Sequence, residues 1–180
     1  WSWSRGLGDV YKRQFNINPE SIEKAITKKT KAIVPVHLFG QVAQMEKIMQ
    51  IAKKHGIFII EDNAQALGAN FTYSNGNKVK AGCIGDIGTT SFFPSKNLGC
   101  FGDGGAIFTN DDELAHLIRG IANHGMYERY YHDVVGVNSR LDSIQAAVLR
   151  IKLRNYNKAI KKRINLAEIY YKNLNDIKGL

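Results

Sequence analysis

The stretch KAIVPVHLFGQVAQMEKIMQIAKKHGIFIIED, residues 31–62, decides the fold class of this chain. It begins with residues 31–36, an apolar and β-branched run that is typical of a buried strand. Across residues 42–55 the apolar side chains recur at helical spacing, and Gly56 is suited to end that helix. Residues 57–61 form a second apolar run of strand type. A strand, a helix and a strand within about thirty residues predict a βαβ unit.

The segments around this unit extend the same pattern. Residues 19–27 form a short amphipathic helix upstream, and Asn75-Gly76 is a strong hairpin-turn signal downstream. Further strands are expected over residues 89–93 and 105–109, and further helices over residues 111–121, after a cap at Asp142, and over residues 155–177. In the helix after Asp142, one side carries Ile144, Ala147, Val148 and Ile151. We therefore expect an α/β fold, with a mostly parallel sheet flanked by helices and an exit into a long helix.

The composition excludes several classes of protein. The chain has 180 residues, of which 44% are hydrophobic and 23% charged, so it has the size and balance of one globular domain rather than a disordered chain. No apolar run approaches the roughly 20 residues that a membrane span requires. Two cysteines, Cys83 and Cys100, are too few for a disulfide framework, and they favour a reducing, cytoplasmic compartment.

A net charge of +9 suggests a nucleic-acid partner at first sight. However, residues 150–180 carry nine basic and two acidic side chains, and residues 1–14 carry three and one, so residues 15–149 are neutral. A DNA-binding helical protein remains an alternative because of residues 150–180. Its affinity for DNA would fall steeply with salt concentration. The basic residues of the final helix show little aromatic interleaving, and we interpret them as a solvated face. We expect neither a nucleic-acid nor a membrane partner.

The two ends of the chain differ from its body. Residues 1–14, WSWSRGLGDVYKRQ, lack helical or strand periodicity, and residues 3–14 resemble the in-frame translation of a transposase adapter used in sequencing libraries. We exclude residues 1–14 from the fold, as one would a fusion scar. Residues 178–180 follow a helix without a closing signal. We therefore expect an internal fragment of a longer protein.

The segment SFFPSKNLG, residues 91–99, carries the most informative candidate for chemistry. Lys96 lies in a short turn directly after an apolar strand, where Phe92 and Phe93 would exclude water and favour its neutral, nucleophilic form. A neutral lysine amine can form a Schiff base with a carbonyl group. An isolated lysine in a loop is more commonly an ordinary surface residue, so this segment alone does not decide between the two.

Other polar residues stand at the ends of predicted strands. Asp62 follows the βαβ strand, where open α/β sheets place their ligands, although taken alone an aspartate here is more commonly a turn or cap residue. Gln65 could bind a ligand or complete the same turn, and Ser91 could bind phosphate or a neighbouring strand. The five histidines form no zinc-binding pattern, and we expect no metal site. Neither a GxSxG elbow nor a Walker A loop is present.

Four motifs in order resemble the DegT/DnrJ/StrS group of pyridoxal-phosphate-dependent sugar aminotransferases. They are PVHLFGQ (residues 35–41), EDNAQALGA (61–69), GDIGTTSFFPSKNLGCFGDGGAIFTND (85–111) and NHGMYERYYHDVVGVNSRLDSIQAAVL (123–149). The resemblance covers residues 15–175 and implies part of a fold type I, aspartate-aminotransferase-like enzyme. Residues 15–150 would form part of the cofactor-binding large domain. Residues 151–180 would begin a truncated small domain.

The resemblance also assigns roles to individual residues. Lys96 matches the lysine that holds pyridoxal 5'-phosphate covalently, Asp62 the partner of the pyridine nitrogen, and Gln65 the residue against the phenolic oxygen. Ser91 and Asn138 match phosphate ligands, of which Asn138 would reach the site of a neighbouring subunit in a homodimer. Substrate contacts are expected from Arg140, in the same loop, and from His37.

The implied reaction is a ping-pong transamination, in which an amino donor such as glutamate supplies nitrogen to a keto group of a nucleotide-linked sugar. The motifs favour carbon three of the sugar over carbon four, and Lys96 argues against the dehydratase branch, which carries histidine there. A regulator of the same fold that binds cofactor or sugar nucleotide without turnover remains the main alternative. A desulfurase or aldolase, with Cys100 as a reactive loop cysteine in the first case, is a further one. Because the family is considerably longer than this chain, we expect the isolated fragment to be inactive.

Overall fold

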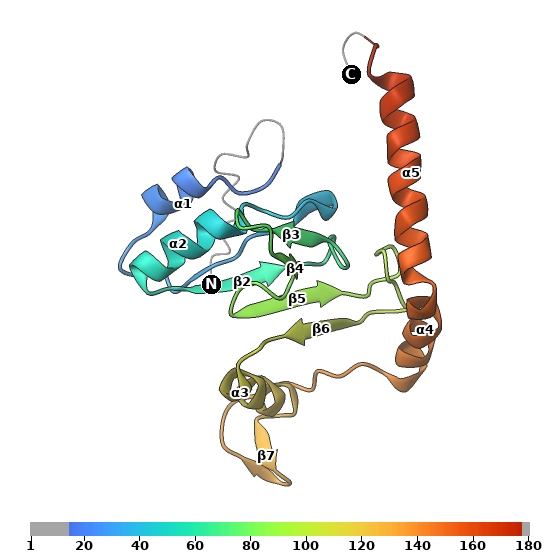
Figure 1. The fold of residues 1–180 in the computed structure, drawn as a ribbon. Helices are drawn as coiled ribbons and strands as arrows, with labels where there is room; N and C mark the ends of the chain where they lie inside the picture. The colour runs from blue at the N-terminus through green and yellow to red at the C-terminus, as the bar shows by residue number, and fades with distance from the viewer. Residues whose placement is uncertain (1–14, 178–180) are drawn as a thin grey trace.

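The computed structural model describes residues 15–177, and its centre is a four-stranded sheet (Figure 1). The strands lie in the order β1 (Ala32–Ile33), β2 (Phe58–Asp62), β5 (Ile87–Ser91) and β6 (Gly105–Phe108). The first three are parallel, and β6 runs antiparallel to β5, with Ser91 opposite Gly105. The prediction of an α/β fold with a mostly parallel sheet is confirmed.

The βαβ unit forms as predicted, with shorter elements. Its helix α2 spans Met45–His55 and ends at Gly56, whose left-handed φ of 62° lets its N–H bond the carbonyls of Ala52 and Lys53. Strand β1 keeps only two residues of the predicted six. Pro35 explains the difference, because a proline has no N–H to donate to a neighbouring strand. Beyond it, only a single bridge joins Val36 to Asp62.

Helices α1 (Pro19–Ala25) and α2 form the main core with the first strands. Asn18 caps α1 by accepting a hydrogen bond from the Glu20 N–H at 3.0 Å. The buried side chains of this core are Ile22, Ile33, Ala43, Met45, Ile48, Ala52 and Ile59. Since the two helices lie together on one side of β2, the apolar face predicted for α2 is the face that packs (Figure 1).

A second, smaller core joins the loop after β5 to the last two helices, α4 (Ser143–Arg154) and α5 (Tyr156–Leu174). Its buried members are Leu98, Cys100, Leu149 and Tyr156. Leu149 is the buried residue of α4, whereas Ile144 and Ile151, which share the predicted apolar side, are 73% and 65% exposed. Apolar periodicity shows which side chains share a face, but it does not show which face another element covers. Asp142 lies at the N-cap position of α4 and makes no capping hydrogen bond.

Two hairpins and one helix complete the fold. Strands β3 (Asn70–Thr72) and β4 (Lys78–Lys80) form the hairpin predicted from Asn75-Gly76, and Gly76 takes a φ of 86° in its turn. Helix α3 (Asp112–Ala122) begins at Asp111, whose carboxylate accepts two backbone hydrogen bonds. A second hairpin, β7 (Met126–Glu128) with β8 (Tyr131–His132), packs beside α3. This second hairpin was not predicted from the sequence.

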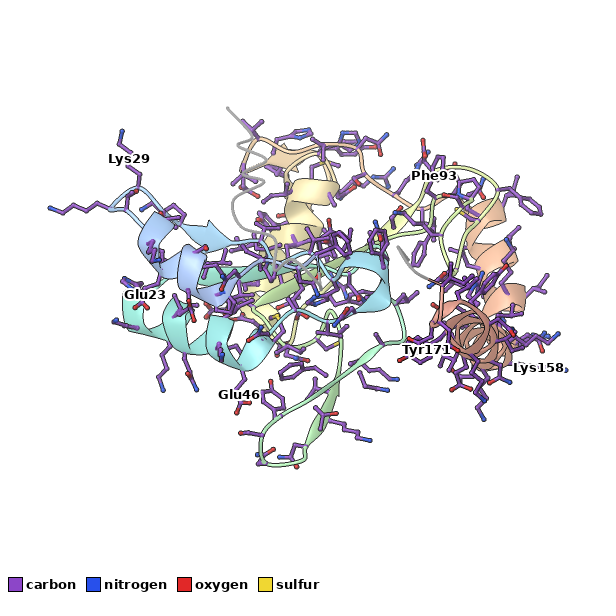
Figure 2. All side chains as sticks on the ribbon, turned by 90° about the horizontal axis from the view of Figure 1, so that it is seen from above. Glu23, Lys29, Glu46, Phe93, Lys158 and Tyr171 are labelled. Carbon is purple, nitrogen blue, oxygen red and sulfur yellow. The ribbon has the colours of Figure 1, made fainter. Side chains whose placement is uncertain are left out.

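Helix α5 stands at the edge of the fold, as the long basic exit helix was expected to do (Figure 1). Lys158 lies on the side of α5 away from the sheet, and Phe93 lies on the loop beside α4 (Figure 2). The helical break falls at Asn155, so the predicted division at residue 150 lies inside α4. Within residues 15–177, no helix combines the length and the apolar character needed to cross a bilayer. The predicted adapter stretch, residues 1–14, lies outside the described residues.

Candidate functional site

The carboxyl ends of β2 and β5 bring Asp62 and Ser91 to one edge of the sheet. The two strands are parallel neighbours, and Asp62 lies opposite Thr89, two residues before Ser91. The carboxylate Oδ1 of Asp62 accepts a hydrogen bond from the Ala64 N–H at 3.0 Å, and the Ser91 hydroxyl oxygen accepts one from Phe93 at 3.2 Å. Both residues therefore also act in turns, which was the alternative role for Asp62, whereas the alternative for Ser91 was a hydrogen bond to a neighbouring strand. Among the hydrogen bonds within residues 15–177, the Asp62 side chain uses only Oδ1.

Lys96 lines a hollow of about 420 Å³ beside this edge. The hollow is lined by Phe39, Ala64, Gln65, Ser95, Lys96 and Asn97. The turn that carries Lys96 is tight, because the Lys96 N–H donates to the Phe93 carbonyl at 2.8 Å. A side chain at Gly99 would come within 2.5 Å of the Pro94 carbonyl oxygen, so only glycine fits there without movement. The structure thus brings Lys96 and Gln65 together, as expected.

The predicted shielding of Lys96 by two phenylalanines is not what the structure shows. Neither ring lines the hollow. Phe92 packs against the second core, and Phe93 is 49% exposed on the outer side of the loop (Figure 2). Because successive residues of an extended segment point to opposite sides, two adjacent rings cannot both cover an amine four residues away. The Lys96 side chain is half-buried through its own loop instead.

Gln65 is oriented by the main chain of Phe39. Its Oε1 accepts a hydrogen bond from the Phe39 N–H at 2.9 Å. Phe39 belongs to a short 3-10 turn, Leu38–Gly40, and takes a φ of 56°, which is uncommon for a residue with a side chain. Since the amide oxygen is engaged, the amide nitrogen is the end of Gln65 that remains to donate to a ligand.

His37 is fully buried in the described residues, and its expected place in a sugar pocket stays a prediction. Its Nδ1 accepts a hydrogen bond from the Ala43 N–H at 3.2 Å, and its Nε2 lies 2.8 Å from Oε2 of Glu61. With Nδ1 accepting, the proton is on Nε2, which donates to Glu61. Both ring nitrogens are thereby used inside the chain. His37 therefore orients Glu61 from the interior, directly before the strand end that carries Asp62.

Glu61 is a buried anchor that the sequence analysis did not single out. Its carboxylate also accepts hydrogen bonds from the N–H groups of Gly82 (2.8 Å), Ile84 (2.6 Å) and Gly85 (2.7 Å). Burial acts to raise the pKa of this carboxyl, but the hydrogen bond from His37 and those from the backbone outweigh burial and hold the pKa below its ordinary value of 4.5. An acidic residue inside the apolar run of residues 57–61 was the available signal, since a buried charge requires partners.

Asn138 and Arg140 lie away from the hollow. Both are exposed in the segment between β8 and α4, and Asn138 forms a bridge with Asn123 at the end of α3. The described residues of this chain therefore do not bring them to Lys96. The expectation that Asn138 reaches the site of a neighbouring subunit stays a prediction.

The cysteine near Lys96 is structural in its surroundings. Cys100 is 1% exposed, and its thiol lies 3.0 Å from the carbonyl oxygens of both Phe92 and Gly102. A reactive cysteine needs exposure and a thiolate-stabilising neighbour, and Cys100 has neither a free surface nor an adjacent cation among these contacts. This arrangement gives no support to the desulfurase alternative.

A larger hollow, of about 680 Å³, lies at the amino-terminal end of β2. Its polar lining includes Thr27, Lys28, Thr30, Lys31 and His55, and it contains no carboxylate. It therefore lacks the combination of amine, acid and amide found near Lys96. In open α/β sheets, ligands bind at the carboxyl ends of the strands, which favours the Lys96 hollow as the site.

The groups at the Lys96 hollow fit the chemical requirements of pyridoxal phosphate. Lys96 offers an amine for an aldehyde, Asp62 a carboxylate for a pyridine N–H, and Gln65 an amide N–H for a phenolate oxygen. Ser91 offers a hydroxyl for phosphate at the neighbouring strand end. These four groups come from two loops that leave adjacent strands.

Comparisons with known proteins agree with this chemistry. The sequence model of the DegT/DnrJ/EryC1/StrS aminotransferase family matches residues 7–180, a match that begins inside the stretch we interpret as adapter. The chain is 49% identical over 174 residues to a pleiotropic regulatory protein of Geobacillus stearothermophilus, and this alignment covers 95% of the chain. It is 52% identical over 163 residues, or 90% of the chain, to the UDP-2-acetamido-2-deoxy-3-oxo-D-glucuronate aminotransferase of Pseudomonas aeruginosa.

A solved structure shows the same fold. The crystal structure of a DegT DnrJ EryC1 StrS aminotransferase from Brucella abortus superposes with a TM-score of 0.87 at 42% sequence identity, over 94% of this chain and 46% of that chain. The chain spans less than half the length of the two curated relatives, 45% and 44% respectively.

Proposed function

The chain belongs to the DegT/DnrJ/EryC1/StrS aminotransferase family, and on this premise we propose that its parent protein is a pyridoxal-phosphate-dependent sugar aminotransferase. The proposed reaction moves an amino group from a donor such as glutamate to a keto group of a nucleotide-linked sugar. The observation that carries the proposal is the shared hollow of Lys96 and Gln65, beside the strand end of Asp62. These residues supply an amine, an amide and a carboxylate, which are the groups that the reaction needs.

Lys96 carries the proton in this scheme. Pyridoxal phosphate, when bound, supplies an electron sink that stabilises negative charge developing on the substrate carbon. The Nζ atom of Lys96 would hold the cofactor at its aldehyde group, and as a free neutral amine it would act as the base that accepts a proton from the donor's α-carbon. Its half-buried position beside Ser95 and Asn97 keeps the amine at the hollow.

The other residues orient the ring and keep its charges in place. The carboxylate of Asp62 would accept the pyridine N–H and so hold a proton at that nitrogen, which strengthens the electron sink. The Nε2 of Gln65 would donate to the phenolic oxygen, since Phe39 occupies the other end of the amide. Ser91 would donate its hydroxyl hydrogen to phosphate, because its oxygen already accepts from Phe93.

We further propose a homodimer with shared sites and a cytoplasmic location. Asn138 and Arg140 are exposed and do not line their own chain's hollow, which suits residues that serve the partner subunit. In this arrangement Asn138 would bind phosphate and Arg140 an anionic group of the substrate. The neutral charge of residues 15–149 gives no support to a nucleic-acid partner.

Carbon three is the proposed position of amination. The Pseudomonas relative, which is 52% identical, is named for a 3-oxo sugar, in agreement with the preference that the motifs express. We expect the sugar and its nucleotide to be selected by residues of the parent protein outside this chain.

The test uses the full-length parent protein. It is loaded with pyridoxal phosphate, mixed with glutamate, and followed by the absorbance change of the bound cofactor. UDP- and dTDP-linked 3-keto and 4-keto sugars are then compared as acceptors. Turnover of a 3-keto sugar nucleotide is expected, and a protein that binds cofactor but shows no half-reaction with any donor would overturn the proposal. The 180-residue chain alone is expected to be inactive, and clear turnover by it would contradict that expectation.

One comparison favours a second candidate function. The Geobacillus relative, 49% identical, is named a pleiotropic regulatory protein. A regulator could keep Lys96 and bind the cofactor or a sugar nucleotide without turnover. The same half-reaction assay separates the two candidates, because a regulator would bind ligand and leave glutamate unchanged.

A further inference from the structure

The junction of α4 and α5 contacts both loops that carry the candidate site. We call this junction the elbow and define it as residues 145–156. At its end, the Tyr156 hydroxyl donates to the Leu67 carbonyl at 2.7 Å, a contact between residues 89 positions apart. The Tyr156 ring is 93% buried and lies 3.1 Å from the position that a side chain at Gly68 would occupy. The elbow is therefore fixed to the loop that begins with Asp62 and Gln65.

The same elbow holds the loop that follows Lys96. The Lys152 ammonium donates to the Gly99 carbonyl at 2.6 Å and lies 5.5 Å from the centre of the Phe101 ring. About two turns earlier on α4, Oε1 of Gln145 accepts hydrogen bonds from the N–H groups of Phe101 (2.8 Å) and Gly102 (3.2 Å). Three backbone groups within four residues are thus bound by two side chains of α4.

These contacts act on the loop that positions the reactive amine. Gly99 is three residues from Lys96. The backbone between them is tightly packed, because a Cβ at Gly99 would lie 2.5 Å from the Pro94 carbonyl oxygen and 2.7 Å from that of Phe93. Leu67, at the other contact, is two residues from Gln65. Asn63, at the start of the first loop, is bonded directly to β5, because its N–H donates to the Thr89 carbonyl at 2.8 Å and its carbonyl accepts from the Thr90 hydroxyl at 3.2 Å. The elbow adds a second connection farther along both loops. Apolar contacts of Leu67 with the second core accompany them.

We propose that the elbow sets the position of Lys96 relative to Asp62 and Gln65, and that Gln145, Lys152 and Tyr156 are positioning residues for the site. The role of the elbow in catalysis rests on the proposed function, whereas the hydrogen bonds of the elbow do not depend on it. Reaction of the amine with a bound carbonyl compound requires close approach at a defined angle, and a displacement of about 1 Å can cost on the order of a hundredfold in rate. A side chain that touches no substrate can therefore control the rate.

The proposal separates hydrogen bonding from packing at one position. Gln145→Glu keeps the acceptor oxygen that binds the Phe101 and Gly102 N–H groups, and Gln145→Met keeps the length of the side chain and removes the acceptor. Tyr156→Phe removes only the hydroxyl and leaves the ring in the second core. Lys158→Met, on the outer side of α5, is the control for introducing a methionine in place of a polar side chain, because Lys158 is exposed and lies on the side of α5 away from the sheet (Figure 2).

The experiment uses the full-length protein with pyridoxal phosphate. The rate of covalent modification of Lys96 is measured by stopping the reaction with borohydride, which reduces the carbon–nitrogen double bond, and by mapping the modified peptide by mass spectrometry. Amide hydrogen exchange of residues 97–102 is measured on the same samples. We expect Gln145→Met to slow modification by about tenfold or more, within the range for a misplaced reacting group, and to speed exchange of this loop.

Gln145→Glu and Lys158→Met are expected to show nearly the same rate of Lys96 modification, and the same exchange of residues 97–102, as the protein without substitutions. Equal rates for Gln145→Met and Lys158→Met would overturn the proposal, and so would an equal loss in Gln145→Glu and Gln145→Met. If Gln145→Met does not fold, Tyr156→Phe decides the question by the same two readouts. If Lys96 is not modified even in the protein without substitutions, the proposed function is refuted. Hydrogen exchange of residues 97–102 would still test the elbow in that case.

Discussion

Replacement of Glu61 by glutamine should destabilise the edge of the sheet that carries the site. Each carboxylate oxygen of Glu61 accepts two hydrogen bonds, one pair from the Ile84 and Gly85 N–H groups and one pair from Gly82 and His37. A glutamine amide has only one oxygen. In either orientation, its NH₂ group would therefore face two donors.

The expected cost follows from this geometry. Two hydrogen bonds to a charged acceptor contribute about 1.5–3 kcal/mol each, and breaking a buried charged pair typically costs about 3–5 kcal/mol. We therefore expect Glu61→Gln to lower the free energy of unfolding of this region by about 3 kcal/mol or more. Glu46→Gln is the control, because Glu46 accepts hydrogen bonds from Ser74 at the exposed surface (Figure 2). Its loss should cost less than about 1 kcal/mol.

Amide hydrogen exchange of residues 82–85 in the parent protein measures the local effect directly. A loss of about 3 kcal/mol corresponds to roughly a hundredfold faster exchange, since every 1.4 kcal/mol is tenfold. Exchange in Glu61→Gln that matches Glu46→Gln would refute the assignment of Glu61 as an anchor.

The pH dependence gives a second check on the same reasoning. Because the pKa of Glu61 is lowered in the folded protein, its contribution to stability is complete above the ordinary value of 4.5 and is lost as the pH falls through the lower, folded pKa. The difference in melting temperature between the parent protein and Glu61→Gln should therefore be constant from neutral pH down to about pH 5 and shrink in more acidic solution. A difference that grows on acidification would contradict a lowered pKa.

Three further substitutions or reactions test the remaining assignments. Lys96→Ala in the parent protein should abolish borohydride-trapped modification and reduce turnover by at least about 10²-fold, the lower end for a lost acid–base group. Gly88→Ala should destabilise by about 3 kcal/mol, because its Cβ would meet the Gly82 carbonyl, whereas Gly76→Ala, with a φ of 86° in open space, should cost about 1 kcal/mol; melting temperatures compare them. A thiol reagent should label Cys83 slowly, because burial and Glu61 raise its pKa, and should label Cys100 only on unfolding, as peptide mapping would show.

The parts of the fold predicted correctly are those with a local cause. Gly56 ends α2 because only a residue tolerant of positive φ reverses the chain there, and Asn75-Gly76 specifies its hairpin turn in the same way. The direction of β6 has no such local signal, because it depends on how the loop of residues 92–104 returns to the sheet. The packed side of α4 likewise depends on a partner distant in sequence.

The residues of the candidate site also differ in whether a local signal predicts their position. The meeting of Asp62 and Ser91 could be predicted, since parallel strands end at one edge. The burial of His37 could not, because the ring's partners are Ala43 and the carboxylate of a strand residue 24 positions later. A histidine beside an apolar run reads equally well as a ligand-binding residue and as an interior one, and the number of its nitrogens already engaged decides between them.

The elbow changes the meaning of the charged end of the chain. By composition, residues 150–180 form a separate basic segment, and the predicted domain boundary falls at residue 150. Yet Lys152 binds the loop of Lys96, and Tyr156 binds the loop of Gln65, so the first turns of that segment belong physically to the site. A charge counted as part of a solvated face is in fact used on one carbonyl oxygen. The domain boundary that the resemblance implies at residue 150 therefore falls between Gln145 and Lys152, the two side chains that together hold the loop after Lys96.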